Sequence, residues 1–254
     1  MQLNFKKFGN GFPLVILHGL MGSLDNWQTL AKQLGEDFEV YCIDQRNHGR
    51  SPHSDEFDYT LLVQDLVDFL HEQKIEKCHL LGHSMGGKTA MHLALEHSEL
   101  VQKIIIVDIA PTAYEDRHRK VFKALNNVDL ATLTDRATAE NKLKEYIADN
   151  ATIQFLLKNL YRDDANHFQW RFNLKALENA YDKISDGIHT HATFTNETLF
   201  IKGGNSDYIN AGNYSEIMDL FPNNELAEIQ QAGHWVHAEQ PAQFIAIVKN
   251  FLLK

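Results

Sequence analysis

Short apolar runs alternate with stretches of helical periodicity along most of this 254-residue chain, and this alternation limits its fold more than any other feature. Apolar runs of this length, bounded by turn residues, are typical of buried strands. Strands that alternate with helices build a mostly parallel sheet with helices on both faces. We therefore expect an α/β fold. The expected strands span residues 13–17, 38–43, 78–81, 104–107, 198–201 and 226–229, and the expected helices of the sheet core span 27–34, 59–70, 84–95 and 241–253.

Residues 111–194 interrupt this rhythm. They contain helix-like stretches at 119–125, 137–147, 153–160 and 174–184, but no strand pattern. The strand pattern returns at Thr198, which favours an insertion over a separate helical domain. Open α/β sheets keep their ligand sites at the carboxyl ends of the strands. We predict a sheet core from residues 1–110 and 195–254, with residues 111–194 as a helical cap over that edge.

The chemistry is indicated first by the pattern Gly-x-Ser-x-Gly, formed by Gly82, Ser84 and Gly86. It lies between an apolar run and a helix-periodic run, which is the context that a nucleophile elbow requires. The sharp turn aims the serine Oγ away from the sheet, and the positive end of the next helix faces it. An incidental serine in a glycine-rich turn is the alternative. The flanking strand and helix favour a nucleophile.

Acyl transfer also needs two backbone N–H groups that stabilise the oxyanion. Met85, directly after the nucleophile, is expected to supply one of them. The other is expected from the loop after the first long apolar run, where Leu20 follows His18-Gly19. An ordinary strand-end turn would explain His18-Gly19 by itself. Its combination with the elbow favours Leu20 as the second donor.

The chain has fourteen histidines, so a histidine alone says little about catalysis. In chains with this elbow the general base comes late in the sequence. His234 lies in a loop after the last expected strand, at the same edge of the sheet as Ser84, and is the predicted base. His237 is the competing candidate. We interpret His83, beside the nucleophile, as a structural part of the elbow.

Two carboxylates compete for the acid that orients the histidine. Asp108 follows the strand after the nucleophile's helix, whereas Asp207 lies after the strand before the histidine, where most such enzymes carry the acid. With Gly203 in register, Ser206 falls on that position, and a one-residue slip would turn Asp207 to the other face. The residues favour Asp108, with Asp207 as the alternative. Either would hold the imidazole in its working tautomer.

Composition argues against several other classes of protein. A net charge of -10 repels phosphate backbones and anionic lipid, so neither nucleic acid nor a membrane surface is an expected partner. No zinc-type ligand spacing and no Walker-type phosphate loop occurs, and we expect no metal and no cofactor. His48 is interpreted as part of a turn that Arg46 anchors.

The two cysteines, Cys42 and Cys78, lie in runs that are expected to be buried strands. A buried reduced thiol behaves as a small apolar group. The N-terminal segment has no pattern of a secretory signal, and we expect a cytoplasmic location. The sequence gives no indication of an oligomeric state.

Several motifs together resemble one family, the YbfF-type bacterial esterases of the α/β-hydrolase superfamily, and the resemblance covers nearly the whole chain. These motifs are His18-Gly19, Asp44-x-Arg46-Asn47-His48-Gly49-x-Ser51, Gly82-His83-Ser84-Met85-Gly86-Gly87-Lys88, Asp108-Ile109-Ala110-Pro111, Gly203-Gly204-Asn205-Ser206, Gly233-His234-Trp235-Val236-His237-Ala238-Glu239, and in the cap Gln154-Phe155-Leu156-Leu157-Lys158 with Trp170-Arg171-Phe172-Asn173. The resemblance implies an α/β-hydrolase fold with a helical cap, and it implies Asp108 as the acid. The family has proline where this chain has Asp207.

The resemblance also implies an activity, the hydrolysis of short-to-medium acyl esters and of acyl-CoA thioesters. Ser84, His234 and an aspartate would carry it through an acyl-serine intermediate on a small-molecule ester or thioester. A C–C bond hydrolase or a lyase can use the same triad, and a ligand-binding protein can share the fold without catalysis. Four apolar cap residues are candidates for an acyl pocket or, alternatively, for the cap's own core: Phe155, Leu156, Trp170 and Phe172.

Overall fold

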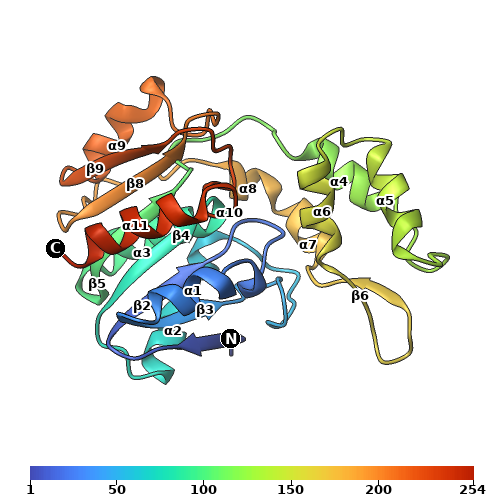
Figure 1. The fold of residues 1–254 in the computed structure, drawn as a ribbon, viewed down its shortest axis with the longest axis horizontal. Coiled ribbons are helices and arrows are strands. Elements are labelled where there is room, and N and C mark those ends of the chain that lie inside the picture. The colour runs from blue at the N-terminus through green and yellow to red at the C-terminus, as the bar shows by residue number, and fades with distance from the viewer.

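The structure is a computed structural model that describes residues 1–254. The strands of its main sheet are β1 (Phe5–Phe8), β2 (Phe12–Leu17), β3 (Phe38–Ile43), β4 (Cys78–His83), β5 (Val101–Val107), β8 (Thr198–Gly203) and β9 (Asn224–Ile229). They lie in the order β1-β3-β2-β4-β5-β8-β9 (Figure 1). β1 is antiparallel to β3, and every other neighbouring pair is parallel. The expected mostly parallel sheet is therefore confirmed.

Helices pack on both faces of this sheet and bury two separate apolar clusters. The helices on one face are α2 (Tyr59–Glu72), α3 (Met85–Glu96) and α9 (Tyr214–Leu220), and those on the other are α1 (Gln28–Leu34) and α11 (Pro241–Leu252). Because both faces are covered, the central strands are continuous apolar runs rather than alternating ones. None of the helices is long and apolar enough to cross a membrane.

The register of the sheet aligns the strand ends that carry the predicted chemistry. Leu17 at the end of β2 lies opposite Gly82 in β4, and Gly82 lies opposite Ile106 in β5. One residue later, Val107 pairs with Ile201 of β8. The loops that follow these strands therefore emerge side by side at one edge of the sheet. That edge is where ligand sites of open α/β sheets lie.

The cap stands apart from the sheet and buries an apolar cluster of its own (Figure 1). Its elements are the helices α4 (Arg119–Asn126), α5 (Arg136–Lys144), α6 (Asn150–Leu157), α7 (Leu174–Asn179) and α8 (Tyr181–Ser185), and the strands β6 (Leu160–Arg162) and β7 (Phe168–Trp170). A few side chains of the core, Met21 and Met85 among them, complete the same cluster. Phe194, which the sequence places in the cap, is buried among core residues.

The structure corrects several local expectations. Residues 111–194 do contain strands: β6 and β7 form an antiparallel hairpin, and strands of three residues are too short to show a period in the sequence. The helix expected over 153–160 ends at Leu157, and the one expected over 174–184 breaks at Ala180 into α7 and α8. Strand β1 was not expected. Its exposed Lys6-Lys7 is typical of an edge strand, where charge discourages pairing with other chains.

Candidate active site

Ser84 occupies the sharp turn between β4 and α3. Its φ of 53° and ψ of -119° lie in a strained region that residues with a Cβ rarely adopt. The turn depends on close backbone approach: a Cβ on Gly82 would lie 2.2 Å from the Gly86 carbonyl oxygen, and one on Gly86 would lie 2.5 Å from the Leu17 and His18 carbonyls. Neither Gly82 nor Gly86 has room for a Cβ, so both positions that flank the serine require glycine.

His234 lies in the loop between β9 and the short helix α10 (Val236–Glu239). Its Nδ1 is 2.8 Å from Asp108 Oδ2. The ring stacks on Tyr208, with centroids 4.0 Å apart and an angle of 19° between the planes. Its backbone carbonyl accepts a hydrogen bond from His83 Nε2 at 2.9 Å. His234 is thus held by a carboxylate, an aromatic face and the histidine of the elbow.

Asp108 follows β5 directly and is fully buried, with φ of 51°. Besides His234, it accepts hydrogen bonds from the Gly203 N–H at 3.0 Å and from Ser206 Oγ. All three partners are donors, and an ionised carboxylate has the lone pairs to accept them together. His234 then carries its proton on Nδ1, which leaves Nε2 free to accept one.

The alternative carboxylate, Asp207, forms no hydrogen bond with His234 and pairs with another residue. Its side chain is 76% exposed and forms an ion pair with Arg117. Ser206, which the register placed on the usual position of the acid, hydrogen-bonds Asp108 instead. The loop after β8 therefore supplies a hydroxyl group, that of Ser206, at the position where most such enzymes carry the carboxylate. Tyr208, in the same loop, had no signal in the sequence because its stacking on His234 depends on the tertiary fold.

The competing histidine, His237, and the elbow histidine, His83, also line the cavity at Ser84 but are themselves buried. His237 stacks on Trp27, with centroids 4.1 Å apart, and burial lowers its pKa to about 3. Burial also holds the pKa of His83 well below its usual value. Neutral side chains enclosed in this way support the structure around His234, and neither contacts a carboxylate.

The loop after β2 brings Leu20 to the elbow. The Leu20 N–H donates to no group within the protein. Met85 is the first residue of α3, where backbone N–H groups have no partner within the helix. Next to Leu20, Met21 has a φ of 58°, and its N–H donates to His48 Nε2 at 3.1 Å. The N–H groups of Leu20 and Met85 are thus both without a partner in the protein.

Two cavities open at Ser84. The larger, about 670 Å³, is lined by Ser84, Leu20 and His234 from the core and by Phe155 and Leu156 from the cap. A volume of several hundred Å³ is ordinary for a small-molecule site. The smaller, about 30 Å³, is bounded by both predicted oxyanion residues and by four tyrosines. The remaining two cap candidates, Trp170 and Phe172, stack on one another within the cap's apolar cluster.

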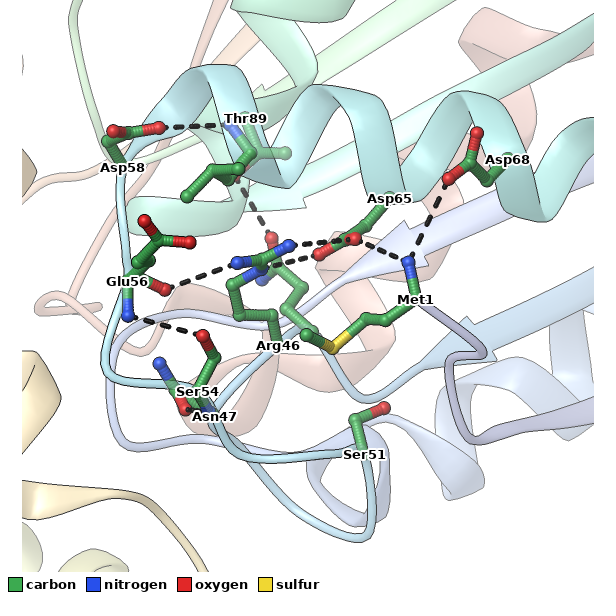
Figure 2. Close-up of polar contacts among 12 residues, drawn as sticks. Met1, Arg46, Asn47, Ser51, Ser54, Glu56, Asp58, Asp65, Asp68 and Thr89 are labelled. Carbon is green, nitrogen blue, oxygen red and sulfur yellow. Dashed lines mark hydrogen bonds and ion pairs between the residues drawn. The ribbon is translucent and has the colours of Figure 1, made fainter.

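Arg46 holds the turn that contains His48 through an ion pair and a hydrogen bond to neighbouring segments. Figure 2 shows the Arg46 guanidinium facing the Asp65 carboxylate of α2. Its Nε and Nη2 donate to that carboxylate at 2.7 and 3.0 Å, and its Nη1 donates to the Glu56 carbonyl at 3.2 Å. Both charged side chains are buried. This pair fixes the turn whose His48 supports the Leu20 loop.

We expect Asp65→Ala to lower the free energy of unfolding by about 3–5 kcal/mol, because it leaves the Arg46 charge buried without its partner. Asp68→Ala, one turn further along α2, is the matched control: that carboxylate is 46% exposed, and we expect a change of less than about 0.5 kcal/mol. Urea denaturation followed by circular dichroism measures both. Equal effects of the two substitutions would contradict the buried ion pair.

A family model described as the alpha/beta hydrolase fold matches residues 13–241. The chain belongs to the α/β-hydrolase family. Its relatives include the esterase YbfF of Escherichia coli, 37% identical, with the match covering 96% of this chain and 94% of that protein. Another is the sn-1-specific diacylglycerol lipase ABHD11 of Danio rerio, 38% identical over 98% of this chain and 80% of that protein.

Among solved structures, a marine microorganism esterase is 40% identical and superimposes on this α/β hydrolase with a TM-score of 0.96. The match covers 98% of this chain and 99% of that structure. The resemblance to YbfF-type esterases that the sequence indicated is confirmed, and so is the α/β-hydrolase fold. Because these relatives are named as esterases and a lipase, the predicted enzyme class, a carboxylic ester hydrolase, is confirmed.

Proposed function

We propose that this α/β hydrolase cleaves short-to-medium acyl esters through an acyl-serine intermediate, with Ser84 as nucleophile, His234 as general base and Asp108 as the acid that orients it. One observation carries the proposal: His234 binds the buried Asp108 at 2.8 Å and shares a cavity with Ser84 of the elbow. The esterase and lipase relatives support ester hydrolysis as the reaction.

The mechanism follows from the tautomer of His234. Its Nδ1–H donates to Asp108, so Nε2 accepts the Ser84 proton as Oγ attacks the acyl carbonyl. The amides of Leu20 and Met85 stabilise the oxyanion. The C–O bond to the alcohol breaks, and the alcohol leaves with the proton that His234 returns. Water, deprotonated by His234, then attacks the acyl-serine and releases the acid and free Ser84.

Thioesters, including acyl-CoA, would react by the same steps, since only the leaving atom changes from oxygen to sulfur. The cavity of about 670 Å³ at Ser84 has room for a substrate of this kind, with an acyl group and a leaving group of moderate size. The proposed route for esters and thioesters uses only side chains, backbone amides and water.

No group of three His, Cys, Asp or Glu side chains that could bind a metal ion is present.

The test is hydrolysis of p-nitrophenyl acetate, p-nitrophenyl butyrate and butyryl-CoA by the purified protein, beside two histidine variants. We expect turnover of the esters, and a loss of about 10⁶-fold in kcat for His234→Ala, as for removal of the base in other serine hydrolases. His237→Asn should stay within about tenfold of the wild type, because His237 faces Trp27 rather than a carboxylate. Absence of turnover for every ester and thioester would exclude the proposed activity.

A further inference from the structure

Met21, the neighbour of Leu20, is held by two side chains from opposite parts of the molecule. Its N–H donates to His48 Nε2 at 3.1 Å, and its carbonyl accepts from Asn159 Nδ2 at 2.9 Å. His48 belongs to the sheet core, whereas Asn159 belongs to the cap and is 138 residues away in sequence. The loop that presents the Leu20 amide is therefore bound to the core on one side and to the cap on the other.

This loop needs such support because of its backbone conformation. Met21 has a φ of 58°, in the left-handed region that a residue with a Cβ adopts only when its surroundings impose it. The Leu20 N–H belongs to the preceding peptide, whose Gly19 carbonyl accepts from the Gly22 N–H at 2.9 Å and lies 2.8 Å from His18 Nδ1. Met21, the next residue of the same turn, depends on the two groups that bind its N–H and its carbonyl. Burial lowers the pKa of His48 to about 3, so that imidazole remains neutral and its Nε2 remains an acceptor at neutral pH. The hydrogen bond from the Met21 N–H to His48 therefore does not change near neutral pH. The second hydrogen bond to Met21, from Asn159, comes from the cap.

Asn159 is well placed to act as a rigid donor. It lies between α6 and β6 and is 4% exposed. Its own carbonyl accepts from the Arg171 N–H at 2.9 Å, which ties it to the end of the β6–β7 hairpin. A carbonyl such as that of Met21 can only accept, so the amide group that faces it must be the NH₂ of Asn159. The orientation of the Asn159 side chain is fixed by this requirement.

Apolar packing joins the cap to both sides of the proposed oxyanion hole independently of this hydrogen bond. The side chains of Met21 and Met85 are each 2% exposed and belong to the cap's apolar cluster, and Leu20 packs against that cluster. One donor residue, Met85, and the neighbour of the other, Met21, therefore touch the cap. A shift of the cap would therefore disturb the packing of the residues that carry or adjoin the two amides.

We propose that Asn159 is a positioning residue for ester hydrolysis: through the Met21 carbonyl the cap helps to hold the turn that presents the Leu20 N–H to the oxyanion. This rests on the proposed function, because the Leu20 amide matters only if an oxyanion forms at Ser84. The cap then does more than cover the cavity. It also helps to hold the loop that carries one of the two oxyanion donors.

The test compares Asn159→Ala and Asn159→Asp with the wild type on p-nitrophenyl butyrate. Oxyanion donors act mainly in the transition state, so we expect kcat to fall by about ten- to a hundredfold, while KM changes by less than about twofold. Asn159→Asp keeps the shape but turns an oxygen toward the Met21 carbonyl, so it should lose at least as much. The affinity for an aryl trifluoromethyl ketone, which adds to Ser84 as an oxyanion, should fall by the same factor as kcat/KM.

Lys183→Ala is the matched control, because it removes another contact between cap and core, the exposed pair of Lys183 with Asp58 at 3.3 Å. We expect its kcat and inhibitor affinity to equal those of the wild type. A kcat for Asn159→Ala within about twofold of the wild type would overturn the proposal, and so would an equal loss in Lys183→Ala. If Asn159→Ala does not fold, Asn159→Asp decides. A wild type without ester turnover instead overturns the proposed function itself.

Discussion

Ser84→Ala is expected to lower kcat for p-nitrophenyl butyrate by about 10⁶-fold, as large a loss as that expected for His234→Ala. The substitution removes the hydroxyl of the elbow serine, which lines the cavity shared with His234. It should leave folding intact, because the strained backbone of the turn is held by Gly82 and Gly86 rather than by the serine side chain. The residual rate would come from the oxyanion donors and substrate binding alone.

Two measurements separate loss of the nucleophile from other causes. A fluorophosphonate probe should add its mass to the wild type and not to Ser84→Ala, because it reacts with an activated serine. Ser98→Ala, an exposed serine beyond the end of α3, serves as the control and should keep both activity and labelling. Labelling of Ser84→Ala, or turnover close to the wild-type value, would refute the assignment of the nucleophile.

The second large effect is expected at the carboxylate. Asp108→Asn should lower kcat by about 10⁴-fold, because an amide NH₂ facing His234 favours the tautomer with its proton on Nε2, and that nitrogen can no longer accept the Ser84 proton. Asp207→Asn is the control, since the Asp207 side chain is 76% exposed and pairs with Arg117 instead. We expect its kcat to stay within about threefold of the wild type.

Steady-state kinetics on p-nitrophenyl butyrate, with circular dichroism to verify folding, decides between the two carboxylates. Loss of activity in Asp207→Asn with Asp108→Asn still active would move the acid to the loop after β8. Ser206→Ala adds a finer test, because its hydroxyl donates to Asp108. Without that donor the carboxylate keeps the Gly203 N–H and His234, and we expect a loss of about tenfold or less in kcat.

Much of this molecule could be predicted from the sequence because its signals are local. The parallel strands are buried on both faces, and burial leaves continuous apolar runs that mark their positions. The elbow is local too, since a turn this sharp needs Gly82 and Gly86 within two residues of Ser84. Once the strands are known to be parallel, the loops after them must meet at one edge. The late position of His234 then follows from chain order.

Two features of the cap could not be predicted from helical or strand periodicity in the sequence. The β6–β7 hairpin consists of two three-residue strands, and the break between α7 and α8 falls at Ala180, an ordinary helix former. The turn residues Asp163, Asp164 and Asn166 between the two strands are a local signal for the hairpin, whereas the break at Ala180 has none. Both arise from packing within the cap, where apolar side chains from several short elements close one cluster.

The order of the motifs along the chain is enough to predict the parts of the proposed site: an oxyanion loop after β2, a nucleophile after β4, a carboxylate after β5 and a histidine after β9. Which carboxylate lies against His234 depends on the tertiary fold. That choice depends on where the loop after β8 turns, and there Ser206 faces Asp108 while Asp207 faces solvent. The contact of Asn159 with Met21 is of the same kind. It joins residues 138 positions apart, and no local pattern encodes a contact that exists only after cap and core have packed.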